Sequence, residues 1–208
     1  MSVGILESPT PVRRRAPARG RTERHMLFGP ATWKQFKRLQ RCFEKGGGAR
    51  VSYLDETIQL MTISLEHESR KSHLSALLES YLIERDITFF FHGSATLESE
   101  IKRAGKEPDE SYCFHTEKKY PDLAIEIAIT SGGIDTLEIY RRFKVSEVWI
   151  WQRDALHVFQ LQGERYALAG ESGHFPKLDL ALLEKCARLP EFLTARKQFL
   201  ADLKKKRR

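Results

Sequence analysis

Cysteine is scarce in this chain of 208 residues, which has three, at positions 42, 113 and 186. They are widely spaced, odd in number and form no C-x-x-C pair. The sequence therefore predicts neither a disulfide framework nor a zinc cluster. No combination of His and Cys residues has a spacing that suggests a transition-metal site.

Long apolar runs are also missing. No stretch approaches the roughly 18 apolar residues of a membrane helix, and the first residues are rich in Pro and Arg rather than in the apolar residues of a secretory signal. We therefore expect a cytoplasmic protein with no membrane partner. Hydrophobic residues still make up 41% of the chain, which is enough for a globular core.

The net charge of +7 is concentrated at the two ends of the chain. Residues 1–24 carry +4 and residues 185–208 carry +7, so the part between them carries −4. Basic ends attract phosphate backbones without reading base sequence, although ordinary solubilising tails have the same composition. We predict a basic disordered extension over residues 1–25, one domain over 26–184, and a basic helical tail over 185–208.

Apolar periodicity predicts an alternation of helices and strands. Helices are expected over 31–43, 66–84 and 135–143, with Asp135 or Ser131 as the N-cap of the third, and again from about 179. Strands are expected over 50–54 and 57–63 as a hairpin, over 88–98 as one bent strand, and over 111–114, 122–130, 147–151, 156–161 and 165–169. This order is typical of α/β and α+β domains.

The clearest strand begins at Asp122 and alternates between two kinds of side chain. One face is branched and apolar, as expected for core, and the other carries Glu126 between Ala124 and Ala128. A carboxylate among apolar neighbours needs a partner, because burying an unpaired charge is costly. That partner is either a metal cation or a basic side chain from a helix.

Two further acids favour the metal. Asp109 opens the preceding strand and is expected beside Glu126 across the sheet, and Glu68 shares a helix stripe with core leucines. Favourable charge near a helix N-terminus is an alternative explanation for Glu68. Three carboxylates converging from a helix and two strands would suit Mg²⁺. We expect His67 to be a surface or capping group.

Four segments, in this order and spacing, resemble the putative restriction endonuclease family of the PD-(D/E)XK nuclease superfamily. They are HES at 67–69, EPDESYCF at 107–114, YPDLAIEIAITSGGIDTLEIYRRF at 120–143 and VSEVWIW at 145–151. The resemblance covers about residues 33–183. It implies a restriction-endonuclease-like α+β fold, with a central mixed sheet flanked by helices.

The same resemblance implies an activity and a site. The activity is metal-dependent hydrolysis of DNA phosphodiester bonds, with Mg²⁺, or Mn²⁺ in its place, as the cofactor. Asp109, Glu126 and the carbonyl of Ile127 would be the metal ligands. Asp109, Glu126 and Glu68 would be the catalytic acids. Because double-strand cutting by one-site nucleases needs two sites, the resemblance also suggests a homodimer.

One part of the resemblance is not matched. The superfamily lysine usually lies two residues after the glutamate, where this chain has Ala128. In the similar family the lysine often lies on the following helix, at the position of Thr136. Lys144 lies roughly 12 Å further along that helix, and Lys118 or Lys119 would reach the site only if their loop folded over it.

Three hypotheses therefore stay open from the sequence. The first is a metal-dependent DNA endonuclease. The second is a catalytically impaired nucleic-acid-binding protein on the same scaffold, because Thr136 replaces the expected lysine. The third is an interaction domain with no nucleic-acid role. No recognition helix or base-reading motif is visible, so the sequence predicts no DNA target. Trp149 and Trp151 are read as core or as dimer surface.

Overall fold

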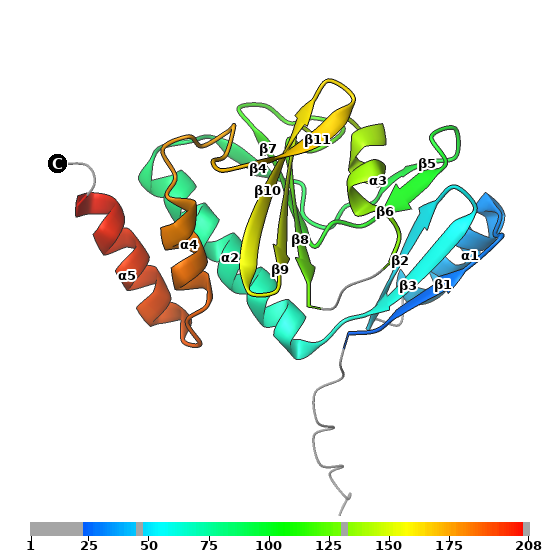
Figure 1. Ribbon diagram of the computed structural model, residues 1–208, viewed down its shortest axis with the longest axis horizontal. Helices are drawn as coiled ribbons and strands as arrows, with labels where there is room; N and C mark the ends of the chain where they lie inside the picture. Colours follow the sequence, from blue (N-terminus) through cyan, green and yellow to red (C-terminus); the bar gives the residue numbers. More distant parts are fainter. Residues whose placement is uncertain (1–22, 45–47, 130–132, 206–208) are drawn as a thin grey trace, which may run out of the picture.

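Two β-sheets stand side by side in the computed structural model, which describes residues 23–44, 48–129 and 133–205 (Figure 1). The larger sheet has the strand order β11-β10-β9-β8-β7-β4. Its strands are β4 (Phe89–Phe91), β7 (Glu110–Phe114), β8 (Leu123–Ala128), β9 (Glu147–Gln152), β10 (Ala155–Gln162) and β11 (Arg165–Ala169). β8 and β9 run parallel and the other neighbours antiparallel, so this is the mixed sheet that was predicted.

The smaller sheet has the strand order β1-β3-β2-β6-β5. Its strands are β1 (His25–Phe28), β2 (Ala49–Leu54), β3 (Thr57–Thr62), β5 (Leu97–Ser99) and β6 (Ala104–Lys106). The predicted hairpin is present as β2 and β3, which turn through Asp55 and Glu56 with φ of 41° and 67°. Positive φ at both central residues is typical of the tight turns that match the twist of a hairpin.

The prediction of one bent strand over residues 88–98 is wrong. β4 pairs with β7 in the larger sheet, whereas β5 pairs with β6 in the smaller one. Between them the chain passes Gly93, which has a φ of 60° that glycine adopts at no steric cost. Residues 88–98 therefore connect the two sheets.

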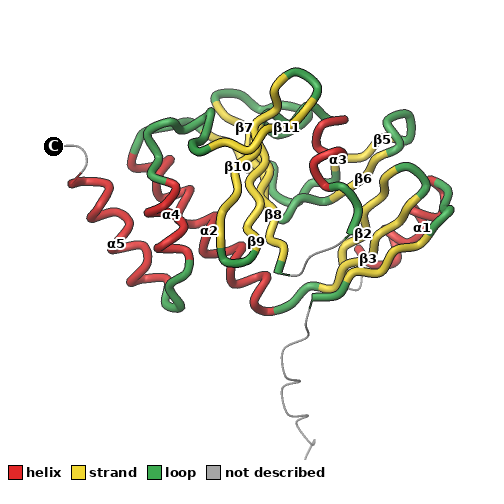
Figure 2. The backbone as a smooth tube through the Cα atoms, in the orientation of Figure 1, coloured by secondary structure: helices red, strands yellow, loops and turns green. Residues whose placement is uncertain are grey.

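Five helices among the described residues cover the sheets. They are α1 (Trp33–Glu44), α2 (Leu65–Glu84), α3 (Thr136–Arg142), α4 (Leu180–Ala187) and α5 (Phe192–Lys205). α1 lies against the smaller sheet, and α2, α4 and α5 lie together beside the larger one (Figures 1 and 2). Asp135 caps α3 by accepting a 2.9 Å hydrogen bond from the backbone N–H of Glu138, whereas Ser131 lies outside the described residues.

The main core lies between the larger sheet and the helices beside it. The apolar face of β8 packs there, and Trp149 and Trp151 are 0% and 1% exposed, which makes both core residues. Phe199 and Leu203 of α5 belong to the same core. The predicted division after residue 184 therefore does not coincide with a break in packing. No helix in the described part of the chain is long and apolar enough to cross a membrane.

At the other end, the predicted boundary at residue 25 falls inside an ordered segment. Glu23 is buried, and β1 pairs with β3 from His25 onwards. Most of the predicted extension, residues 1–22, lies outside the described residues.

Residues 107–109 join the two sheets directly. They follow β6 of the smaller sheet and lead into β7 of the larger one. α3 is tied to the smaller sheet, because the guanidinium of Arg142 pairs with Asp55 at 2.5 Å and donates to the carbonyl of Lys102 at 2.8 Å. Side chains from both sheets and from the start of α3 consequently meet in the space between the sheets.

Candidate active site

Asp109 directly precedes β7, and Glu126 lies on the neighbouring strand β8 of the larger sheet. The register pairs Glu110 of β7 with Ile125 of β8, so the next residues outward, Asp109 and Glu126, stand opposite each other. Asp109 Oδ2 accepts a 2.7 Å hydrogen bond from the backbone N–H of Ile127. Directly opposed residues have Cβ atoms about 4.5–5.5 Å apart. The two carboxylates, which are 2% and 6% exposed, therefore share one buried site.

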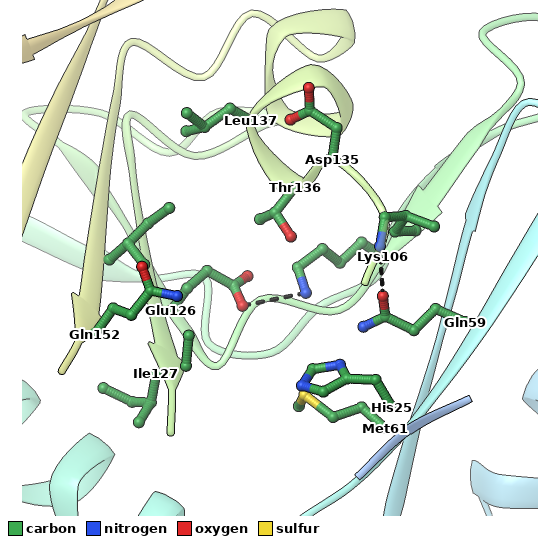
Figure 3. Close-up of a pocket in the computed structure, with 13 residues that line it drawn as sticks. His25, Gln59, Met61, Lys106, Glu126, Ile127, Asp135, Thr136, Leu137 and Gln152 are labelled. Atoms are coloured by element: carbon green, nitrogen blue, oxygen red, sulfur yellow. Dashed lines mark hydrogen bonds and ion pairs between the residues drawn. The ribbon is translucent and has the colours of Figure 1, made fainter. Parts of the chain in front are cut away.

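Glu126 has a partner on each carboxylate oxygen. Lys106 Nζ lies 3.1 Å from Oε2, and the Tyr140 hydroxyl donates a hydrogen bond to Oε1 (Figure 3 shows the lysine contact). Burial raises the pKa of Glu126, and the nearby charge of Asp109 adds to this, whereas Lys106 opposes it. Burial and the charge of Glu126 raise the pKa of Tyr140 well above its usual value, so Tyr140 stays a hydrogen-bond donor.

Asp109 is linked through His67 to Glu23, and we call these three residues the carboxylate–histidine chain. His67 Nε2 lies 3.0 Å from Asp109 Oδ1, and His67 Nδ1 lies 3.0 Å from Glu23 Oε2. Burial alone would lower the pKa of His67, but the two carboxylates raise it to about 9. His67 is thus a buried cation at neutral pH, and the expectation that it is a surface or capping group is wrong.

One oxygen of Asp109 lacks an aligned donor. His67 Nε2 and Arg50 Nε lie 3.0 and 3.3 Å from Asp109 Oδ1, close enough for ion pairs. None of the described residues, however, gives this buried oxygen a hydrogen bond of normal angle. Burial acts against ionisation, yet the contact with His67 and the charges of Arg50 and Lys106 hold the pKa of Asp109 below its usual value. Asp109 is therefore a carboxylate whose Oδ1 is held by two ion pairs but receives no hydrogen bond of normal angle from the described residues.

A cavity of about 250 Å³ opens beside Glu126, between the sheets (Figure 3). Its lining includes Lys106, Ile127, Ala128 and Thr136. Gln59 Oε1 closes one side by accepting a 2.7 Å hydrogen bond from the backbone N–H of Ile134.

Glycine is needed at one point of this wall. Gly133 has a φ of 109°, and a Cβ atom there would lie 2.2 Å from Gln59 Oε1. Glycine adopts this positive φ at little steric cost, and without a Cβ it lets the segment leading into α3 lie against the Gln59 side chain.

Glu68, the third predicted acid, is directed elsewhere. Its Oε2 lies 2.5 Å from Lys71 Nζ, and its side chain is 41% exposed. Consecutive residues on an α-helix point about 100° apart, so α2 presents His67 to Asp109 and turns Glu68 towards Lys71. The residue that α2 contributes beside Asp109 is therefore the buried imidazole of His67, and not the carboxylate of Glu68 that was expected.

Neither Lys118 nor Lys144 takes the place of the missing lysine. Lys118 and Lys144 pair with Asp122 and Glu164 at 2.7 and 2.5 Å. The cation beside Glu126 is instead Lys106, which was not among the predicted site residues. Its one signal in the sequence is its place three residues before Asp109.

A divalent cation fits the acidic pair. Over the described residues, no group of three or more His, Cys, Asp or Glu side chains forms a metal site. Mg²⁺ does not require three, because it is held by one or two carboxylates and keeps several waters. Asp109 Oδ1 lacks a hydrogen bond of normal angle from the described residues, and a divalent cation at Glu126 would share that carboxylate with Lys106.

The mixed sheet, its flanking helices and the second sheet define a restriction-endonuclease-like α+β protein. A family model described as putative restriction endonuclease, Uma2, matches residues 33–189, and the chain belongs to this family. No curated protein matches the chain. Membership of the family supports a nuclease-like role.

Proposed function

We propose that this protein is a metal-dependent endonuclease that hydrolyses phosphodiester bonds in DNA. The observation that carries the proposal is the buried pair of Asp109, directly before β7, and Glu126 of β8, which stand opposite each other, with Glu126 lining the cavity between the sheets. The nuclease-like role of the family supports the reaction class.

Asp109 and Glu126 would hold Mg²⁺ or Mn²⁺, with the carbonyl of Ile127 as a further ligand. The bound ion would supply Lewis-acid chemistry, polarising the scissile phosphate and lowering the pKa of a water. The protein's own part is to fix the ligands. The Ile127 N–H and His67 orient Asp109, and the Tyr140 hydroxyl orients Glu126.

The charge distribution supports DNA as the substrate. The part of the chain between its ends is slightly acidic, whereas residues 185–208 carry +7. A basic region of this kind gains affinity for DNA by releasing counterions from the phosphates. This contribution falls steeply as the salt concentration increases. A domain with no role in nucleic-acid binding would not show this dependence, so a salt titration of DNA binding separates the two.

The test is plasmid cleavage by the purified full-length chain in Mg²⁺ or Mn²⁺. Asp109→Asn and Glu126→Gln keep the shape of each side chain and remove its charge. We expect each to reduce cleavage by about 100-fold or more. The matched control is Glu98→Gln, since Glu98 of β5 is half-buried and pairs with Lys37 of α1 at 2.6 Å.

The outcomes are distinct. Cleavage that persists in both site variants would show that another site, or a contaminant, cuts the DNA. DNA binding without cleavage by the unsubstituted protein would favour the impaired nucleic-acid-binding protein. Glu68→Gln belongs in the same series, because the ion pair between Glu68 and Lys71 predicts nearly unchanged cleavage.

A further inference from the structure

Lys106 is the feature of the site that the acidic pair does not account for. Its side chain comes from β6 of the smaller sheet, is 5% exposed and reaches across to Glu126 of the larger sheet at 3.1 Å. Lysine is almost never this buried without a partner. A salt bridge placed purely for stability is weak, because the desolvation of both groups offsets most of the attraction.

The position of Lys106 is rigidly built. β6 pairs with β2 on one side and with β5 on the other. At Gly105 a Cβ atom would lie 2.6 Å from the ring of Phe36, so the α1 side chain packs directly on the strand next to the lysine. A residue that acts on a substrate is best placed on such an element rather than on a loop.

The ammonium of Lys106 also borders the cavity. Lys106, Glu126 and Thr136 all line it. In Figure 3 the Lys106 side chain points at the Glu126 carboxylate, with the Thr136 side chain directed towards the same space from the start of α3. A lysine at position 136 would therefore enter the region that the Lys106 ammonium already occupies.

We propose that Lys106 is the catalytic cation of this site and stands in place of a lysine on α3. The inference rests on the proposed nuclease function. In the cavity, the Lys106 ammonium would contact the scissile phosphate and stabilise the charge that develops on its oxygens. Thr136 is then compatible with activity, because Lys106 of β6 supplies the positive charge that a lysine on α3 would otherwise supply.

The same geometry makes Lys106 a competitor for Glu126. A cation bound by Asp109 and Glu126 would share the Glu126 carboxylate with the ammonium. Removing the ammonium would leave that carboxylate to the metal alone. Lys106→Met should therefore bind Mn²⁺ more tightly than the unsubstituted protein does, in the absence of DNA.

The experiment compares Lys106→Met, Thr136→Lys and the double variant Lys106→Met/Thr136→Lys in plasmid cleavage. We expect Lys106→Met to lose about 100-fold in rate, and the double variant to recover about tenfold or more, because a lysine on α3 returns a cation to the cavity. Thr136→Lys alone should not raise the rate. The matched control is Lys37→Met, which removes the lysine of the Lys37–Glu98 pair outside the cavity.

The second readout is the Mn²⁺ affinity, measured by calorimetry at about pH 8 without DNA. We expect tighter binding by Lys106→Met and unchanged binding by Lys37→Met. If Lys106→Met does not fold, the double variant takes its place, and cleavage within about tenfold of the unsubstituted rate supports the proposal.

A folded Lys106→Met that cleaves within about threefold of the unsubstituted rate would overturn the proposal, since one lost catalytic contact costs far more. So would a double variant that folds and stays inactive. If the unsubstituted protein does not cleave DNA, the nuclease function fails separately. The Mn²⁺ measurement then decides whether Lys106 shares Glu126 with a metal, and unchanged affinity would reject that role as well.

Discussion

Glu23 holds His67 by a 3.0 Å contact between Oε2 and Nδ1, although 44 residues separate them in the chain. Both side chains are completely buried. The other nitrogen of the imidazole faces Asp109. The segment just before β1 is therefore joined electrostatically to the acidic pair, and its loss would leave His67 with one carboxylate instead of two.

The charge on His67 predicts how the stability of the metal-free protein depends on pH. The pKa of His67 is about 9 in the folded protein and 6.5 without its partners. Its contribution is thus fully present below about pH 6.5 and is lost as the pH rises through 9. In EDTA, we expect the free energy of unfolding to fall by something on the order of 3 kcal/mol between about pH 6 and 9.5, measured by urea denaturation.

Two variants control this measurement. His67→Gln should be less stable at neutral pH and should lose most of the pH dependence. His73 lies on the same helix and contacts the ring of Phe192. The His73→Gln variant should therefore keep the pH dependence of stability of the unsubstituted protein. An unchanged slope in His67→Gln would mean that the carboxylate–histidine chain does not hold a proton in this range.

Tyr140→Phe is predicted to weaken the protein through Glu126. The substitution keeps the buried ring and removes the hydroxyl that donates to Glu126 Oε1. A buried carboxylate oxygen without its donor costs about 1–3 kcal/mol. We expect this loss in thermal unfolding in EDTA, and a smaller loss in Mn²⁺, because a bound cation would offset the charge of the buried Glu126 oxygen that has lost its donor.

The comparison for that prediction is Tyr166→Phe, whose hydroxyl donates to the carbonyl of Val145 at 2.5 Å. Its loss of stability should be the same with and without metal. If Tyr140→Phe also showed no difference between EDTA and Mn²⁺, Glu126 would not be a metal ligand.

Phe199→Ala tests whether the C-terminal helix belongs to the core. Phe199 is fully buried in the cluster that contains the apolar face of β8. Truncating such a side chain leaves a cavity and costs about 3–5 kcal/mol, which urea denaturation would detect. Leu193→Ala, on the same helix but 56% exposed, should change stability little. If Phe199→Ala left the free energy of unfolding unchanged, residues 185–208 would be a tail outside the core.

The parts of the fold that could be predicted from sequence are those with a strong local pattern. β8 alternates over its whole length, and α2 carries apolar residues at helical spacing from Leu74 to Leu82. β6 has three residues, Ala, Gly and Lys, with no alternation to find. The separation of β4 from β5 depends on pairing with strands elsewhere in the chain, which the segment itself does not encode.

The site divides in the same way. Asp109 and Glu126 could be found because both lie in a recognisable stretch of sequence, one directly before β7 and the other on the adjacent strand β8. Lys106 and Glu23 reach the site from the smaller sheet and from the segment before β1, so their positions follow from how the two sheets meet. His67 was misjudged because helical spacing alone does not distinguish a histidine facing solvent from one facing a buried carboxylate.

The three-residue connection from β6 to β7 has a mechanical consequence. Lys106 stands at its start on one sheet, and Asp109 stands at its end on the other. A rotation of the smaller sheet would withdraw the ammonium from Glu126, while Asp109 and Glu126 would keep their spacing because they share the larger sheet. The distance between Asp109 and Glu126 is thus independent of the angle between the sheets, whereas the distance from Lys106 to Glu126 depends on that angle.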